Sequence, residues 1–226
     1  MKTVCILLLT ITIASALATY DLEWQEFKSG SIESVCCIKY GDPVALSTQN
    51  LIDCVSYGCN GGFFSDGFIY CAANDGLDTE ESYPYTGLFD GIDTEESYPY
   101  TVLQDTCQFD EANAHCSCSG YVTIAPGDED ELLAAIATVG PVAAAIDASQ
   151  YSFQLYVSGV YYEANCSSDQ VDHGVLIIGY GTENEEDYWI VKNSWGETWG
   201  ESGYIRMARN RDNNCGIATE ATYPLV

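Results

Sequence analysis

Two short segments near the end of the chain carry the residues best suited to acid–base chemistry. His173 stands between Asp172 and Gly174, and Asn193 opens the sequence Asn-Ser-Trp-Gly. A histidine changes charge near neutral pH, so it can accept and return a proton, and a neutral amide beside it can fix its tautomer. The two residues are therefore the base and the orienting group of a Cys-His-Asn arrangement for nucleophilic catalysis.

The sequence pattern predicts that neighbouring strands hold these two residues. Residues 175–178 are all apolar and end at Gly-Tyr-Gly, which predicts a buried strand, and residues 188–191 predict the next one. An antiparallel hairpin of the two strands brings His173 and Asn193 side by side at one edge.

The elements before this hairpin change from helices to strands. Residues 128–139 predict a helix with Asp128 as its N-cap and Gly140-Pro141 as its stop, and residues 142–146 predict a strand. We expect a short helix near Ser47 and a short helix or turn at 151–156. This order predicts two bodies with a cleft between them.

Further motifs occur in an order that chance does not explain. They are Gln49-Asn50-Leu51-Ile52-Asp53-Cys54, Cys59-Asn60-Gly61-Gly62, Glu81-Ser82-Tyr83-Pro84-Tyr85, Gly140-Pro141-Val142 and Cys215-Gly216-Ile217-Ala218. With the His173 and Asn193 segments they resemble the papain-like cysteine peptidases of cathepsin L type, over roughly residues 31–226. The resemblance implies an α+β, two-domain fold with an incomplete helical N-terminal domain and an antiparallel, β-barrel-like C-terminal domain.

The resemblance also implies a role for individual residues. His173 would be the general acid and base, Asn193 would fix its tautomer, Trp195 would shield their hydrogen bond and Trp199 would line the leaving-group side. The implied substrate-binding residues are Gly61, Gly62, Phe63, Phe64, Ala145, Val171, Asp172, Trp195, Trp199 and Glu220. The implied disulfides are Cys54–Cys107 and Cys166–Cys215. The aromatic residues among them are equally compatible with plain core packing.

Glu220 has a more specific implied role. The resemblance places it at the floor of a pocket walled by Phe63, Phe64, Ala145 and Val171. A buried carboxylate there would admit an Arg or Lys side chain of the substrate beside the usual Phe or Leu. The alternative is an exposed Glu220 with no such role.

The family's nucleophile segment, C-G-[SA]-C-[WY], is absent from the chain, as is the oxyanion-hole glutamine upstream of it. An ungapped overlay puts Trp24 and Gly30 on family residues and Glu23 on the nucleophile; the alternative is a flexible acidic leader. A carboxylate at that place pairs with His173 but cannot replace a thiolate in acyl transfer. Cys36 and Cys37 lie in the middle of a predicted helix, where a thiol lacks the helix N-terminus that activates it.

The first residues predict export. Residues 1–18 have the charged start, apolar run and small-residue end of a secretory signal peptide, so the product is expected to be secreted or lysosomal. Residues 19–30 are interpreted as a remnant of the pro-region and a junction, and 31–226 as the peptidase domain. Of the eleven cysteines, ten remain after the signal. Cys59 is expected to be unpaired or mispaired, and the partners of Cys36, Cys37, Cys71, Cys116 and Cys118 stay open.

Charge limits the partners. The net charge of −27 argues against nucleic acid and anionic membranes, and protonation of carboxyl groups in an acidic compartment would relieve the repulsion. The expected partners of a monomer are protein or peptide substrates and cystatin-like inhibitors. No cofactor or metal is expected, since His115, Cys116 and Cys118 are spaced too closely for a tetrahedral site.

Two features add no predicted function. Residues 76–86 recur as 91–101, which we interpret as a duplication in which one copy bulges out as a surface loop. Asn165-Cys166-Ser167 is a formal glycosylation sequon, but its occupancy is doubtful because Cys166 is expected in a disulfide.

The sequence thus predicts a cysteine-type endopeptidase by descent that is inactive as sequenced. The alternatives are a secreted pseudo-protease that binds peptides or cystatin-like inhibitors, and a product that does not fold.

Overall fold

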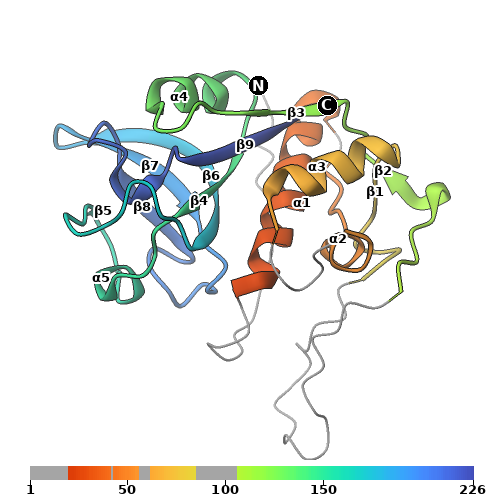
Figure 1. Ribbon diagram of the computed structural model, residues 1–226, viewed down its shortest axis with the longest axis horizontal. Coiled ribbons are helices and arrows are strands. Elements are labelled where there is room, and N and C mark those ends of the chain that lie inside the picture. Colours follow the sequence, from red (N-terminus) through yellow and green to blue (C-terminus); the bar gives the residue numbers. More distant parts are fainter. Residues whose placement is uncertain (1–19, 42, 56–61, 85–105) are drawn as a thin grey trace, which may run out of the picture.

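The computed structural model describes residues 20–41, 43–55, 62–84 and 106–226, with side chains from residue 29 onward (Figure 1). The helices are α1 (Tyr20–Tyr40), α2 (Thr48–Cys54), α3 (Phe64–Ala73), α4 (Glu129–Thr138) and α5 (Tyr151–Gln154), with short 3-10 turns at Glu111–Asn113 and Asn214–Gly216. The strands are β1 (Leu77–Asp78), β2 (Ala114–His115), β3 (Gly120–Thr123), β4 (Val142–Ile146), β5 (Val160–Tyr161), β6 (His173–Glu183), β7 (Glu186–Lys192), β8 (Tyr204–Ala208) and β9 (Glu220–Leu225). Within this part of the chain, none of the helices has the length and apolar character to cross a membrane. The expected signal peptide lies outside the described residues.

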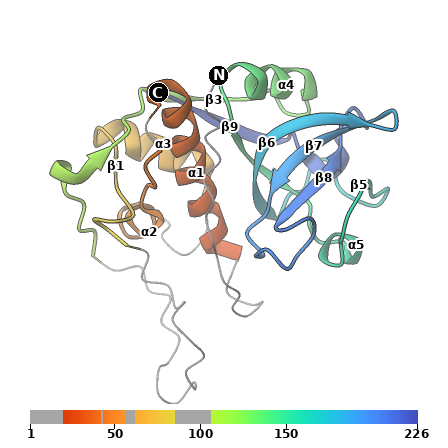
Figure 2. The ribbon, with the colours of Figure 1, turned by 180° about the vertical axis from the view of Figure 1, so that it is seen from behind.

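Helix α1 stands at the centre of the molecule, between α2 and α3 on one side and the large sheet on the other (Figures 1 and 2). It runs without a break from Tyr20 through the expected junction near Lys28. Ser31 donates a hydrogen bond to the carbonyl of Pro141 at 3.0 Å, and the buried Glu33 carboxylate accepts the Leu46 N–H at 2.7 Å. The backbone of residues 20–30 therefore belongs to the same helix as Ser31 and Glu33, which these bonds anchor.

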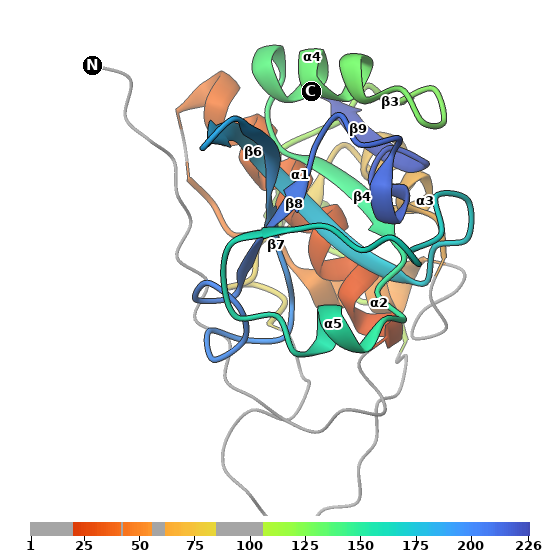
Figure 3. The same cartoon turned by 90° about the vertical axis from the view of Figure 1, so that its left-hand side faces the viewer.

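The large sheet has seven strands in the order β3-β9-β4-β6-β7-β8-β5. All neighbouring pairs are antiparallel except β5 and β8, which run parallel. The sheet is open, with β3 and β5 at its edges, so the expected barrel does not close. Helix α4 lies over one end of this sheet and α5 lies at the opposite end (Figure 3).

Strands β4 and β6 separate two cores. Val142, Ala144 and Ile146 belong to the sheet-side core, whereas Ala143 and Ala145 belong to the helix-side core, because successive side chains of a strand point to opposite faces. Burial on both faces explains why every residue of β4 is apolar and buried. The helix-side core consists of Ile32, Cys36, Leu46, Leu51, Val55, Phe64, Phe68, Cys71, Leu77, Cys118, Ala143, Ala145 and Leu176.

The predicted helix near residue 130 is present, with Asp128 as its N-cap. Asp128 caps α4 by accepting the Glu131 N–H at 2.8 Å, and the Glu131 carboxylate accepts the Ala125 N–H, also at 2.8 Å. Glu129 is a structural residue that the sequence did not reveal. Its carboxylate accepts the indole N–H of the fully buried Trp189 at 3.2 Å and the backbone N–H groups of Asn210 and Asn213.

The first copy of the sequence repeat is part of the fold. Leu77 is completely buried, Asp78 pairs with Ala114 between β1 and β2, and the Tyr83 hydroxyl donates to Asp53 at 2.6 Å. The second copy, 91–101, lies outside the described residues.

Disulfide bonds stabilise both the helical body and the sheet-side body. Cys54–Cys107 and Cys166–Cys215, the two bonds implied by the resemblance, are present. Cys36 is bonded to Cys116, a pairing that the sequence left open, and Cys37 is disulfide-bonded too. Cys59 lies outside the described residues.

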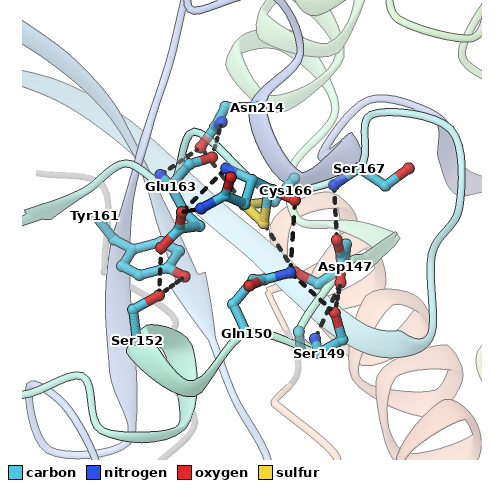
Figure 4. The surroundings of a disulfide bond; sticks show 12 residues. Asp147, Ser149, Gln150, Ser152, Tyr161, Glu163, Cys166, Ser167 and Asn214 are labelled. Atoms are coloured by element: carbon cyan, nitrogen blue, oxygen red, sulfur yellow. Dashed lines mark hydrogen bonds between the residues drawn. A yellow bond between two sulfur atoms is a disulfide. The ribbon is translucent and has the colours of Figure 1, made fainter.

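Asp147, just after β4, lies beside the Cys166–Cys215 disulfide (Figure 4). It accepts hydrogen bonds from the backbone and hydroxyl of Ser149 at 3.0 and 2.6 Å, and from the Ser167 N–H at 2.7 Å. Burial alone raises the pKa of this carboxyl, but the hydrogen bonds from Ser149 and Ser167 together outweigh burial, so the pKa lies below its ordinary value. The folded state therefore favours ionised Asp147.

We expect Asp147→Asn to lower the free energy of unfolding by about 1–3 kcal/mol at pH 7, because three hydrogen bonds to a carboxylate are weakened. Since the pKa is lowered on folding, the carboxylate contributes stability at pH values above its unfolded pKa, and this stability is lost as the pH falls through the folded pKa. Urea unfolding at pH 7, 5 and 3 should show the gap between wild type and variant closing at low pH. Asp169→Asn is the matched control, because it removes the same charge from an exposed side chain in the loop that carries Ser167. A gap that is independent of pH would contradict the assignment.

Candidate active site

His173 and Asn193 meet at the base of the β6–β7 hairpin. His173 is the first residue of β6, and Asn193 follows the last residue of β7. The His173 Nε2 atom lies 2.8 Å from Asn193 Oδ1. The histidine is completely buried and the asparagine is 4% exposed, so their hydrogen bond is shielded from water. The predicted juxtaposition of the two residues is present.

Neighbouring backbone groups determine which ring nitrogen of His173 carries the proton. The Ser194 N–H donates to Asn193 Oδ1 at 2.8 Å, and the Asn193 N–H donates to the Gly203 carbonyl at 3.0 Å. The amide oxygen is thus an acceptor, and the His173 Nε2 atom must be the donor. In the neutral imidazole, Nδ1 then carries the lone pair and is the atom that can take a proton.

An aromatic cluster surrounds this pair. The Trp195 ring lies 5.1 Å from the His173 ring, centroid to centroid, and the Trp199 ring lies 5.3 Å from Trp195. Phe153 of α5 contacts both tryptophans edge-on or tilted, at 5.4 and 5.2 Å, and lies 6.1 Å from His173. Such packing excludes water from the His173–Asn193 bond and strengthens it by lowering the local dielectric.

Phe153 was not predicted as part of the site. It is completely buried, but it lies in a helix of only four residues, which is too short to show a hydrophobic period. Contacts with residues distant in the sequence position α5: the Trp199 indole N–H donates to the Gln154 carbonyl at 3.1 Å. The segment Tyr151-Ser152-Phe153-Gln154-Leu155-Tyr156 holds several bulky apolar and aromatic residues, so Phe153 did not stand out among them.

Asp172 supports the backbone before His173. Its carboxylate accepts the Ala148 N–H at 2.8 Å, and its own N–H donates to the Ile146 carbonyl at 2.9 Å. These bonds join the start of β6 to the end of β4. Asp172 thereby helps to hold His173 in its place.

The other predicted substrate-binding residues differ in their exposure. Phe64 and Ala145 are buried in the helix-side core, and Val171 packs against that core, whereas Phe63 is 63% exposed. Ala145 faces this core because of the alternation along β4. Gly62 is described, with a φ of 122°, and Gly61 lies outside the described residues.

Glu220 is exposed, so the expectation of a buried carboxylate at a pocket floor is wrong. The residue pairs with Ala145 across β4 and β9, at the first position of β9. A charged side chain at the exposed end of a strand stays in contact with water, which explains why Glu220 is not buried.

Cysteines in the described part of the chain are placed away from a catalytic role. Cys36 and Cys37 lie well inside α1, as expected, and both are disulfide-bonded. The two free cysteines of this part, Cys71 and Cys118, are buried in the helix-side core. The side chain of Glu23, which the overlay puts at the nucleophile's place, lies outside the described side chains, although its backbone belongs to α1.

The described residues also contain no group of three or more His, Cys, Asp or Glu side chains that is suited to hold a metal ion. His115 is half-buried in β2, and Cys116 is committed to its disulfide with Cys36.

Comparison with known proteins agrees with this geometry. Residues 24–225 match the family described as papain family cysteine protease, and the match begins at Trp24, the residue that the overlay aligns with the family's tryptophan. A cathepsin L-like protein of Caenorhabditis elegans is 49% identical over 208 residues, covering 90% of this chain and 57% of the relative. Digestive cysteine proteinase 1 of Homarus americanus is 49% identical over 208 residues, covering 90% of this chain and 60% of the relative.

A human relative and a solved structure extend the comparison. Cathepsin L2 of Homo sapiens is 44% identical over 211 residues, covering 90% of this chain and 59% of that protein. The structure of digestive procathepsin L 3 from the larval midgut of Tenebrio molitor superposes with a TM-score of 0.77 at 40% identity, covering 91% of this chain and 65% of that one. The chain thus spans between 57% and 60% of the lengths of these curated relatives. With the β6–β7 hairpin, its His173–Asn193 pair and the sequence match along the chain, this protein belongs to the papain family of cysteine proteases.

Proposed function

We propose that this chain derives from a cysteine-type endopeptidase of the cathepsin L type and that, as sequenced, it does not hydrolyse peptides. The observation that carries the proposal is the buried Nε2–Oδ1 hydrogen bond of 2.8 Å between His173 and Asn193. An imidazole held in one tautomer by a neutral amide is suited to activate a thiol and later to protonate a leaving amine. The residues that orient the base are present, and the nucleophile is not.

The missing groups determine the loss of activity. A thiolate forms the acyl intermediate, and no other group here replaces it, because a carboxylate at position 23 is a far poorer nucleophile toward an amide. The oxyanion-hole glutamine is missing as well, and losing one such donor typically reduces turnover by about 10²–10³-fold. His173 therefore keeps the geometry of a base that has nothing to deprotonate.

The location and substrates follow from the relatives. Among the similar proteins are digestive cysteine proteinases of Homarus americanus and a procathepsin L of an insect larval midgut. Together with the predicted signal peptide, they support a secreted or lysosomal protein whose complete form acts on protein substrates.

The test compares this chain with a completed version that carries the family's G-x-C-G-S-C-W segment before Ser31 and one copy of the repeat. We expect no release of fluorophore from a fluorogenic peptide by the chain itself, and turnover by the completed version that His173→Ala abolishes. Sequencing the native transcript across residues 28–31 and 76–101 determines which of the two versions the cell makes. Peptide hydrolysis by the unaltered chain that disappears in its own His173→Ala variant would refute the proposed inactivity.

A further inference from the structure

The turn Cys116-Ser117-Cys118 brings two cysteines to the helix-side core at one place. Cys116, directly after β2, is bonded to Cys36 of α1. Cys118 lies with its sulfur 2.7 Å from the sulfur of Cys71, which belongs to α3. The Cys71 sulfur is also 3.4 Å from the carbonyl oxygen of Cys116. Four cysteines from three segments are therefore gathered around one short turn.

The contact between Cys71 and Cys118 is too close for two separate thiols. A separation of 2.7 Å is shorter than the sum of two sulfur van der Waals radii, and a small side-chain rotation brings it to the bonded value of about 2.05 Å. Both residues are buried, Cys71 completely and Cys118 to all but 4%, among Ile32, Phe68 and Leu77. An apolar core without room for two thiols accommodates one disulfide.

We propose that Cys71 and Cys118 are joined by a disulfide in the mature protein. The single turn at 116–118 is then bridged to α1 through Cys36 and to α3 through Cys71. The two short bridges fix both helices to one point of the chain. The helical body thereby holds its packing through covalent bonds as well as apolar contacts.

The bond forms by oxidation during folding. Two thiols lose two protons and two electrons, and a low-molecular-weight disulfide such as oxidised glutathione accepts them. The thiolate of one cysteine attacks that disulfide and releases one glutathione thiol; the second cysteine then attacks the mixed disulfide and releases the other. In the folded, reduced protein the hydrogen bond to Cys118, together with burial, raises the pKa of the Cys71 thiol, so the exchange takes place before the core closes.

The experiment uses the full chain, secreted from a eukaryotic host and denatured at acidic pH without reductant. Free thiols are alkylated, the protein is digested, and fragment masses locate the label. We expect neither Cys71 nor Cys118 to carry the label before reduction and both to carry it after reduction. Alkylation of both residues in the unreduced protein would overturn the proposal, and this readout does not depend on any variant folding.

Single substitutions identify the partner. Cys71→Ser should leave one new labelled cysteine, Cys118, and Cys118→Ser should leave Cys71. Cys36→Ser is the matched control: it should release Cys116 and leave Cys71 and Cys118 unlabelled. Label on Cys116 in the Cys71→Ser protein would show that Cys71 pairs with Cys116, and the proposal would be wrong.

Discussion

Glu23→Cys is expected to create a thiol that reacts with iodoacetamide about 10²–10³-fold faster at pH 6 than an ordinary protein thiol, because the overlay implies a place beside His173, whose imidazolium would lower the thiol pKa far below its usual value of about 8.5. The overlay on the family's nucleophile segment selects this position, and the helix from Tyr20 to Tyr40 extends through it. The same variant should show slow peptide hydrolysis, at a rate about 10²–10³-fold below that of a completed enzyme, because the oxyanion-hole glutamine is still missing. Quenched time courses of alkylation measure the reactivity of the thiol, and a fluorogenic peptide assay measures the rate of hydrolysis.

Two control variants separate activation by His173 from simple exposure of a thiol. In Glu23→Cys/His173→Ala the rapid alkylation at pH 6 should disappear, since no imidazolium remains to stabilise the thiolate. Gln25→Cys places the thiol two residues further along α1, about 200° around the helix axis, and should react at the ordinary rate. Equal alkylation rates for cysteines at positions 23 and 25 would contradict both the overlay and the proposed origin of the site.

Phe153→Ala is expected to lower the free energy of unfolding by about 3–5 kcal/mol, the usual range for removing a fully buried aromatic ring. The Phe153 ring is completely buried and lies between 5.2 and 6.1 Å from the rings of Tyr161, His173, Trp195 and Trp199. Few nearby groups can move to fill the cavity, because these large rings are themselves packed against one another. Urea unfolding followed by tryptophan fluorescence measures the change.

Tyr151→Ala is the matched control for this prediction. Tyr151 belongs to the same short helix but is 79% exposed, so its removal should change the stability by less than about 0.5 kcal/mol. In a completed, active enzyme, Phe153→Leu should keep most of the stability while letting water reach the His173–Asn193 bond, which would lower the rate more than the stability. Similar losses of stability from Phe153→Ala and Tyr151→Ala would show that the aromatic cluster is not a packed unit.

The covalent links matter to the interpretation of such variants. Cys166–Cys215 holds the loop beside Asp147 in the sheet-side body, and Cys36–Cys116 holds α1 in the helical body. Measurements with and without reductant therefore report on different parts of the chain. Stabilities should be compared with all bonds oxidised, because reduction adds chain entropy to the unfolded state.

Several features could be predicted from the sequence because they depend on residues close together in it. A histidine before an apolar run and an asparagine after the next strand define the two ends of a hairpin, so the pairing of His173 with Asn193 needed only the turn between them. Likewise, Asp128 and Gly140 mark the two ends of α4 through local capping chemistry. The family and the disulfides Cys54–Cys107 and Cys166–Cys215 were implied by motifs whose order along the chain can be recognised from the sequence alone.

Only the tertiary structure decided the contacts between distant segments. Cys36 and Cys116 are separated by 80 residues, and nothing in their local sequence selects one partner among the available cysteines. The burial of Ala145 and the exposure of Glu220 depend on which face of β4 meets α1 and where β9 begins. Every residue of β4 is apolar, so this strand has no alternation of apolar and polar residues that would indicate its faces or its register. Phe153 became part of the site for the same reason: a four-residue helix has no period of its own, and its place comes from the rings that surround it.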